Sequence, residues 1–297
     1  MTEQDAQLLV GDGPPDPESH GEGPCWDART GTLYWVDMFH RALHATNPAT
    51  GADRIIETDS TVCAPAPRAA GGLIVMLEKR LVFLDPATGA TEDVATIEES
   101  VSGNRANDAK CDPQGRFWVG TMAIDAADGA GGLYRVDTDG GVTQMLDGVT
   151  IGNGLAWSAD HATMYYIDSA VGEVWAFDYD AASGDIGNRR AAVTIPEGWG
   201  LPDGMSIDSE GLLWVALWGS GRVVRFDPRD GSAKHEVRTG ADQTTSCCFG
   251  GPDLDQLFIT TSAYQLDAAA LASQPRAGGV FRAAPGATGL PTDAFGG

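Results

Sequence analysis

Six similar β-rich segments, spaced 40 to 49 residues apart, predict that residues 1–297 form a single all-β domain, a six-bladed β-propeller with four antiparallel strands per blade. Most segments continue through a tight turn into a second apolar run, and turn sequences such as Pro-Ala-Thr-Gly are typical of β-hairpins. Long stretches of helical periodicity are absent, which argues against a β/α barrel or a Rossmann-type sheet. The aligned strand cores are GTLYWVD (31–37), GGLIVML (71–77), GRFWVGT (115–121), ATMYYID (162–168), GLLWVAL (211–217) and DQLFITT (255–261).

The two ends of the chain are expected to close the ring. The sixth repeat stops after GGVFRAA (278–284) without an outer strand, which the N-terminal run AQLLV (6–10) could supply. GDGPPDPES (11–19) then reads as a polar linker into the first blade, and the sequence leaves open whether it covers a site as a lid. Because a closed ring removes free sheet edges, we expect a monomer.

The net charge, the N-terminal sequence and the cysteines limit the partners and the cellular compartment that we expect. Nineteen basic against 42 acidic residues give a net charge of −23, which disfavours binding to nucleic acid and to anionic membrane surfaces. The N-terminus has no secretory pattern, and no window approaches the ~20 apolar residues of a membrane span. The five cysteines form no CxxC pair and read as reduced, mostly buried thiols, so we expect a cytoplasmic protein.

Polar residues stand at the heads of the inner strands that precede the aligned cores. Inner strands line the channel of a propeller, so equivalent heads should form a ring about the axis. Two carboxylates and two amides facing one point can be satisfied by a hard divalent cation; Ca²⁺ is favoured, with Mg²⁺, Mn²⁺ or Zn²⁺ as alternatives. Alternatively, the heads hydrogen-bond the strand ends and water fills the channel. The equivalent heads are Glu22, Ala64, Asn107, Asn153, Asp203 and Thr245.

Longer motifs occur in blades 1 and 3–6. They are GEGPCW (21–26), RANDAKCDPQGRFWVGTM (105–122), NGLAWSADHATMYYIDS (153–169), AFDYDAASGDIGNRR (176–190), PDGMSIDSEGLLWVA (202–216), GRVVRFDP (221–228) and TTSCCFGG (244–251). In this order they resemble the senescence-marker-protein (SMP-30)/gluconolactonase family, which includes the regucalcins and bacterial aldonolactonases. The resemblance implies a six-bladed, metal-dependent sugar lactonase.

The resemblance also implies roles for single residues. Glu22, Asn153 and Asp203 would hold one metal ion, and Asp203 would also be the base that activates water. Arg105 and Asn107 would bind substrate hydroxyls. Asp125 stands where family members carry a glutamate that contacts substrate, and its shorter side chain puts that contact in doubt.

The implied reaction is hydrolysis of an aldonolactone, a small-molecule sugar lactone, to its aldonic acid, with the metal polarising the carbonyl. Phosphotriester hydrolysis on a similar propeller is one alternative, although Arg105 and Asn107 favour a polyol. A non-catalytic scaffold with a structural metal is another. Cys247 and Cys248 read as core residues that point to opposite faces of a strand, whereas Trp199 and Trp218 could pack between blades or reach the rim of the pocket.

Overall fold

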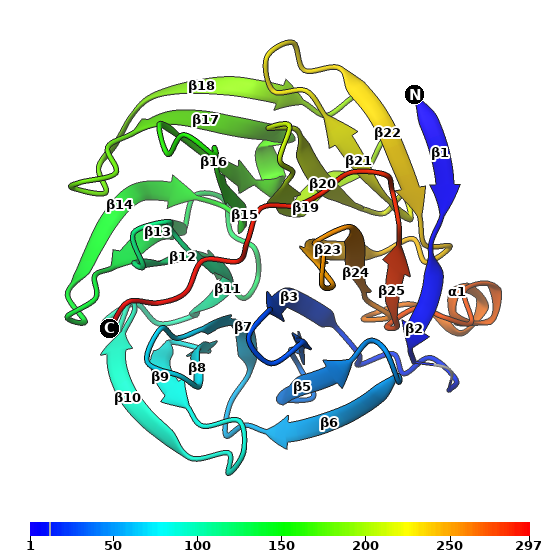
Figure 1. Ribbon diagram of the computed structural model, residues 1–297, viewed down its shortest axis with the longest axis horizontal. Coiled ribbons are helices and arrows are strands. Elements are labelled where there is room, and N and C mark those ends of the chain that lie inside the picture. The colour runs from blue at the N-terminus through cyan, green and yellow to red at the C-terminus, as the bar shows by residue number, and fades with distance from the viewer. Residues whose placement is uncertain (12) are drawn as a thin grey trace.

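The computed structural model describes residues 1–11 and 13–297, and its sheets form a ring of six blades around a central axis (Figure 1). The first strand of each blade is innermost, because it contacts the first strands of both neighbouring blades. The predicted six-bladed β-propeller is confirmed. One residue of the predicted 11–19 linker, position 12, lies outside the described residues.

Blades 1 to 3 each contain four antiparallel strands in chain order from the axis outward. Blade 1 has β3 (Gly21–Asp27), β4 (Thr32–Asp37), β5 (Ala42–Asn47) and β6 (Ala52–Glu57). Blade 2 has β7 (Val62–Pro67), β8 (Leu73–Leu77), β9 (Arg80–Leu84) and β10 (Thr91–Thr96). Blade 3 has β11 (Asn104–Cys111), β12 (Phe117–Ala123), β13 (Gly131–Val136) and β14 (Val142–Val149).

Blades 4 to 6 repeat this order, and the N-terminus completes the ring. Blade 4 has β15 (Gly152–Trp157), β16 (Thr163–Asp168), β17 (Glu173–Tyr179) and β18 (Ile186–Thr194), with the 3₁₀ turn η1 (Ser169–Val171) after β16. Blade 5 has β19 (Leu201–Ile207), β20 (Leu213–Trp218), β21 (Arg222–Phe226) and β22 (Ala233–Arg238). Blade 6 has β23 (Thr244–Gly250), β24 (Gln256–Thr261) and β25 (Val280–Ala283), with the short helix α1 (Ala268–Ser273) between the last two.

The predicted ring closure is confirmed, with one addition. Strand β2 (Gln7–Val10) pairs antiparallel with β25 and becomes the outer strand of blade 6. Strand β1 (Thr2–Asp5) then pairs in parallel with β22, so blade 5 has a fifth strand. The N-terminal segment thus ties blades 5 and 6 together, because it crosses from one blade to the next (Figure 1).

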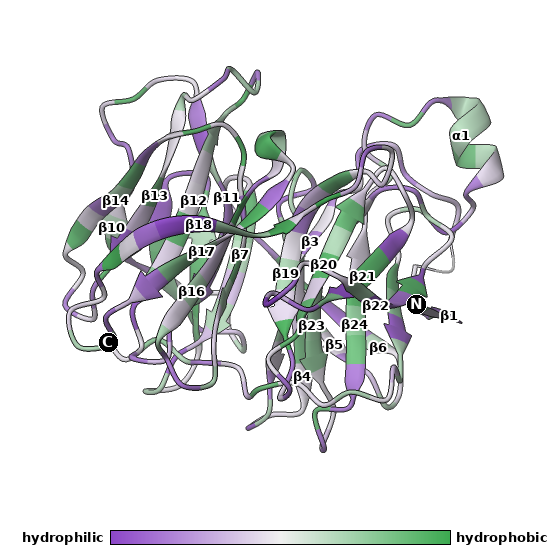
Figure 2. Ribbon diagram, turned by 90° about the horizontal axis from the view of Figure 1, so that it is seen from above, coloured by the Kyte–Doolittle hydropathy of each residue, from purple (hydrophilic) through white to green (hydrophobic). Residues whose placement is uncertain are grey.

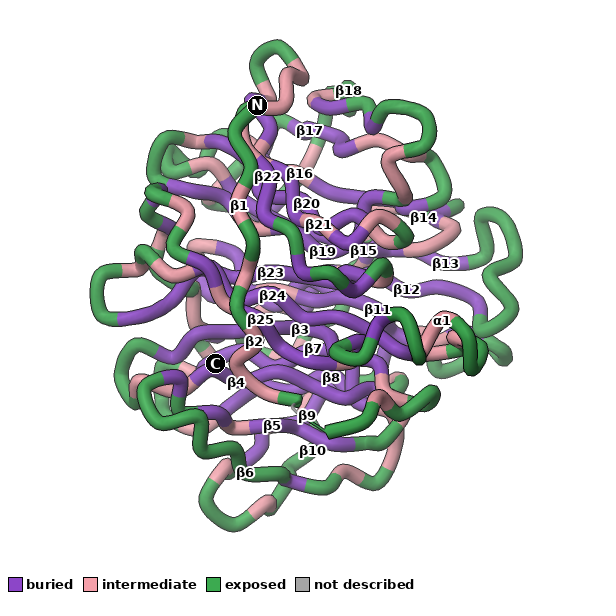
Figure 3. Tube along the Cα trace, turned by 90° about the vertical axis from the view of Figure 1, so that its right-hand side faces the viewer, coloured by how far each residue is buried: buried purple, intermediate pink, exposed green. Residues whose placement is uncertain are grey.

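The hydrophobic core lies between neighbouring blades. Trp118 of blade 3 packs on Trp157 of blade 4, and Trp214 of blade 5 packs on Phe249 of blade 6. Inner strands are buried throughout, whereas the outer strands and turns are exposed (Figure 3). Outer strand β18 is accordingly hydrophilic over much of its length, seen from the side (Figure 2). No helix in the described residues is long or apolar enough to cross a bilayer.

A repeated aspartate fixes the turn between the first and second strands. Asp112 accepts hydrogen bonds from the backbone N–H of Gln114 and Arg116 and, at 3.0 Å, from the indole nitrogen of Trp118. Asp208 accepts the equivalent bonds in blade 5, with Trp214 at 2.9 Å. An aspartate side chain that satisfies the backbone of its own turn stabilises that turn. This motif therefore sets where the second strands of blades 3 and 5 begin.

All five cysteines are buried and free, as predicted. Burial raises the pKa of Cys25, Cys63 and Cys247 to about 12. Cys247 packs with Trp214 between blades 5 and 6, whereas Cys248 packs with Trp26 toward blade 1. The two adjacent thiols thus serve opposite faces of one strand, as predicted for core residues.

Candidate metal centre

A β-bulge interrupts the innermost strand of every blade at the level of the predicted heads. A bulge leaves one or two residues unpaired and turns them away from the regular ladder. The interruptions lie in equivalent positions of the six inner strands, and in every blade except blade 2 a polar side chain stands in or beside the bulge. They lie between Glu22 and Cys25, Val62 and Ala64, Ala106 and Ala109, Asn153 and Leu155, Pro202 and Met205, and Thr244 and Ser246.

Contacts between neighbouring bulges run around the axis. On one side, Asn107 of blade 3 donates to the side-chain oxygen of Asn153 of blade 4 at 3.0 Å. On the other, the Thr245 hydroxyl of blade 6 donates to the backbone oxygen of Gly21 of blade 1 at 2.6 Å. Heads of neighbouring blades are therefore in contact, directly between blades 3 and 4 and through the Gly21 backbone between blades 6 and 1.

Glycines next to the heads permit this approach. A Cβ on Gly154 would lie 2.7 Å from the backbone oxygen of Asp203, and a Cβ on Gly204 would lie 2.0 Å from Ser246 Oγ. Both distances are too short for a side chain, so these two positions require glycine. Close backbone approach between blades therefore explains the glycines beside these heads.

The three residues expected to hold a metal are all buried at the bulges. Glu22 and Asn153 are each 4% exposed and Asp203 is 7% exposed. The Asn153 amide donates to Ser169 Oγ at 2.8 Å, which fixes its side-chain oxygen toward the axis side that Asn107 also contacts. The only hydrogen bond to the Glu22 carboxylate in the described residues comes from the neighbouring Gly23 N–H, at 3.0 Å.

The electrostatics of this ring are unfavourable for bare carboxylates. Burial, and next the charge of Asp108, raise the pKa of Glu22 to about 8. Burial and the charges of Glu22 and Asp108 raise the pKa of Asp203 well above its ordinary value. Asp108, buried beside Asn107, has its own pKa raised by burial. Three acids thus share a site in which Arg105 only partly offsets their charge.

This donor set fits a divalent cation. Two carboxylates and an amide oxygen are ligands that Ca²⁺ or Mg²⁺ prefers, and a dication would relieve their mutual repulsion. No group of three or more His, Cys, Asp or Glu side chains with metal-binding geometry occurs in the part of the chain that the structure describes. An ion here would therefore depend on Asn153 as well as on the two carboxylates, which disfavours a zinc-type His/Cys site.

Two of the expected substrate-binding residues belong to this network and one lies apart. Arg105 donates to the Asn107 side-chain oxygen at 2.7 Å, and Asn107 in turn contacts Asn153. Asp125 is exposed in the turn after β12 and accepts a hydrogen bond from the Ala127 N–H at 3.2 Å. The structure thus does not bring Asp125 to the ring, and its contact with substrate stays a prediction.

In blade 2 the predicted head, Ala64, lies beside the bulge rather than in it, as Glu22 and Asn153 also do in their blades. The bulge leaves Cys63 unpaired, whereas Ala64 pairs with Met76. The Cys63 thiol points to the next blade and donates to the Ala106 backbone oxygen at 3.1 Å. Counting back from the strand core cannot locate the unpaired residue, because the bulge leaves two residues unpaired in blades 1, 3 and 5 and one in blades 2, 4 and 6.

Sequence reasoning missed an aromatic group beside the ring. His20 hydrogen-bonds Ser262 Oγ through Nδ1 at 2.9 Å, and burial with the nearby Arg105 lowers its pKa to about 3. Phe39 and Tyr264 pack against it. The sequence does carry one signal for this group: Phe39 and Tyr264 each lie two to three residues after the second strand of their blade.

The sequence left open whether Trp199 and Trp218 pack between blades or reach the rim of the pocket, and the structure places them differently. Trp218 lies against His20, with ring centroids 5.8 Å apart, so it belongs to the aromatic group. Trp199 packs on Phe226 beneath the guanidinium of Arg222 and is a packing residue of blade 5.

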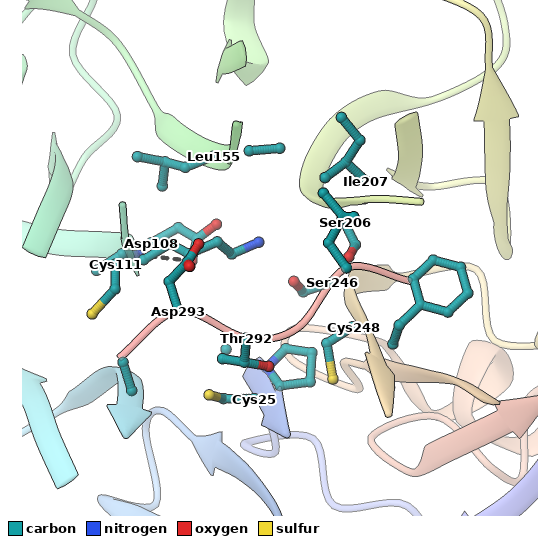
Figure 4. Close-up of a pocket in the computed structure, with 18 of the residues that line it drawn as sticks. Cys25, Asp108, Cys111, Leu155, Ser206, Ile207, Ser246, Cys248, Thr292 and Asp293 are labelled. Atoms are coloured by element: carbon teal, nitrogen blue, oxygen red, sulfur yellow. Dashed lines mark hydrogen bonds between the residues drawn. The ribbon is translucent and has the colours of Figure 1, made fainter. Parts of the chain in front are cut away.

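The channel continues behind the ring as a cavity of about 100 Å³. Asp108 and Lys110 line it, and the C-terminal residues Leu290 to Asp293 cross its far end (Figure 4). Glu22, Asn153 and Asp203 do not line this cavity. Since Phe295 is fully buried and its backbone pairs with blade 2, the C-terminal segment closes the channel opposite the metal-binding level.

Comparison with known proteins identifies the family. Residues 20–263 match the model of the SMP-30/gluconolactonase/LRE-like region. The chain is 39% identical to regucalcin of Oryctolagus cuniculus, over 93% of this chain and 95% of the relative. It is 38% identical to YvrE of Bacillus subtilis strain 168, named as a candidate sugar lactone lactonase, over 89% and 90%.

A solved structure agrees with this match. The calcium-binding protein regucalcin of Agrobacterium tumefaciens strain C58 superposes with a TM-score of 0.93 at 30% identity, covering 99% of both chains. Sequence and structure thus agree over nearly the full length. The chain belongs to the SMP-30/gluconolactonase/LRE-like family.

Proposed function

We propose that this protein is a divalent-metal-dependent lactonase that hydrolyses sugar aldonolactones to aldonic acids, with Glu22, Asn153 and Asp203 holding the metal. The observation that carries the proposal is that the buried carboxylates of Glu22 and Asp203 lie close enough for Glu22 to raise the pKa of Asp203, while Asn153 lies in the adjacent blade, where the neighbouring Gly154 approaches the Asp203 backbone. Lactone hydrolysis is supported by the family, whose name includes gluconolactonase, and by a relative that is named as a candidate sugar lactone lactonase. The calcium-binding description of the Agrobacterium relative supports Ca²⁺ as the ion.

In this proposal Asp203 is the residue that moves a proton. A bound dication would polarise the lactone carbonyl and stabilise negative charge on its oxygen. Asp203 accepts the proton of the attacking water, a role for which a buried carboxylate with a raised pKa is better suited than an exposed one. Binding a cation lowers that basicity, so Asp203 must balance both tasks.

Arg105 and Asn107 orient the substrate. Within the described residues the hydrogen bonds of Arg105 come from one terminal nitrogen, to Asn107 and to the Ala106 backbone oxygen. Its remaining donors are left for ring hydroxyls or for the new carboxylate of the product, a task that suits a planar fork of donors. Asn107 is fixed between Arg105 and Asn153, so it links substrate binding to the metal-binding level.

A pH-indicator assay tests the proposal. Glucono-, xylono-, galactono- and arabinonolactones are offered to chelator-treated protein, and then again after Ca²⁺, Mg²⁺, Mn²⁺ or Zn²⁺ is restored. We expect proton release above the spontaneous rate that stops on chelation and returns with one of these ions. Hydrolysis that is indifferent to chelation, or no hydrolysis with any ion, would contradict the proposal.

A further inference from the structure

Four aromatic side chains gather beside the metal-binding level. We name His20, Phe39, Trp218 and Tyr264 the aromatic wall. Phe39 stacks on His20 with centroids 5.1 Å apart and packs on Tyr264 at 4.4 Å. Trp218 and Tyr264 meet the edges of His20 at 5.8 and 5.9 Å. The wall is thus one contiguous cluster, although its members come from blades 1, 5 and 6.

The wall lies at the end of the propeller where the inner strands begin. His20 directly precedes β3 and stands two residues before Glu22, and it bridges to Ser262 after β24. Trp218 pairs with Leu201 at the start of β19, the strand that carries Asp203. The guanidinium of Arg105 lies 5.8 Å from the centre of the Phe39 ring. The wall therefore lies beside the polar residues of the proposed site.

Three members of the wall are partly accessible, unlike the two large tryptophans between the blades. Phe39, Trp218 and Tyr264 are partly exposed, whereas Trp118 and Trp214 between the blades are fully buried. A partly exposed aromatic surface next to buried charges costs free energy unless something apolar covers it. An occupant should therefore present an apolar face to the wall and polar groups to Arg105.

We propose that the aromatic wall is a stacking subsite for the C–H face of a cyclic sugar lactone, whose hydroxyl groups point toward Arg105 and Asn107. This inference rests on the proposed function and deepens it, because it makes ring shape a determinant of specificity. A closed sugar ring has a flat C–H face, and aromatic rings bind such apolar faces by dispersion. The open-chain acid loses this face when the ring opens. The wall thus favours substrate over product and assists product release.

Ligand-detected NMR tests the wall without requiring turnover. In saturation-transfer experiments we expect ring C–H protons of methyl β-D-glucopyranoside to receive saturation from the calcium-loaded protein. Sorbitol, which carries similar hydroxyls on an open chain, should receive several-fold less. Phe39→Ala and Tyr264→Ala should each lower the pyranoside signal several-fold. The matched control is Phe83→Ala in blade 2, a half-buried phenylalanine that also lies beneath an arginine, Arg68, and that should leave the signal unchanged.

Kinetics separate the failure of this inference from the failure of the proposed function. If lactones are hydrolysed, Phe39→Ala and Tyr264→Ala should raise KM about tenfold while kcat changes less than about twofold, because stacking is lost away from the reacting carbonyl. Phe39→Leu should restore part of the loss. The stacking subsite alone would be overturned if the pyranoside and sorbitol signals were equal. It would also be overturned if the wall variants kept the wild-type signal and KM. A wall-dependent pyranoside signal without any lactone hydrolysis would retain the wall and reject the lactonase.

Discussion

Calcium binding to the metal-free protein should release protons, and the affinity should therefore rise steeply with pH. Glu22 has a pKa of about 8 in the folded protein, so at about pH 7 roughly nine-tenths of its carboxyl groups carry a proton that a cation must displace. Asp203, whose pKa is also raised, adds to this release. With Glu22 alone, the apparent affinity should increase about 50-fold between about pH 6 and about pH 8.

Isothermal titration of Ca²⁺ into chelator-treated protein measures both quantities. At one pH, the heat in PIPES, HEPES and Tris should vary linearly with the ionisation enthalpy of the buffer, and the slope counts the protons released. Glu22→Gln, which keeps an amide oxygen but cannot ionise, should release about one proton fewer. Heats that do not depend on the buffer, together with an affinity that stays constant over this pH range, would refute the assignment of Glu22 as a ligand.

Three further predictions separate the roles of individual residues. Asp203→Asn should lower kcat at least about 10³-fold and weaken calcium binding. Asp208→Asn, in the same blade but bonded to Trp214, should instead lower Tm and leave calcium binding of the folded protein intact. If calorimetry and kinetics gave the reverse pattern, the roles assigned to the two aspartates would be exchanged. Asp125→Ala should change KM less than about twofold because its carboxylate is exposed and bonds only its own turn, and a larger change would show that this turn closes over substrate. Phe295→Ala should lower the free energy of unfolding by about 3–5 kcal/mol in chemical denaturation, because a fully buried ring is lost; a loss below about 1 kcal/mol would mean that the C-terminal segment does not seal the channel.

The architecture could be predicted because it repeats. Six strand cores at similar spacing, each preceded by an aspartate or glycine turn, leave few alternatives to a propeller, and the missing outer strand of blade 6 identified the N-terminal run as its closure. The fifth strand of blade 5 could not be predicted. Strand β1 is short, polar and mostly exposed, so its pairing with β22 depends on the neighbouring edge rather than on its own hydrophobic pattern.

The ring of heads could be predicted to within about one residue, because periodicity locates a strand but not a bulge. This limit explains why Ala64 was predicted as a head, whereas the unpaired residue of its bulge is Cys63. The aromatic wall was harder to predict, since Phe39 and Tyr264 lie in loops outside the repeat and meet only in three dimensions. The repeat gives no reason to choose His20, because it does not occupy a head, yet it stacks on Phe39 and stands two residues before Glu22.

Anomalous diffraction from crystals soaked in Mn²⁺ tests the central claim most directly, because it locates the ion without reference to activity. The account predicts one strong peak on the channel axis, within about 2.0–2.6 Å of oxygen atoms of Glu22, Asn153 and Asp203. A peak elsewhere with this ring empty, or a peak that survives unchanged in Asp203→Ala, would contradict it.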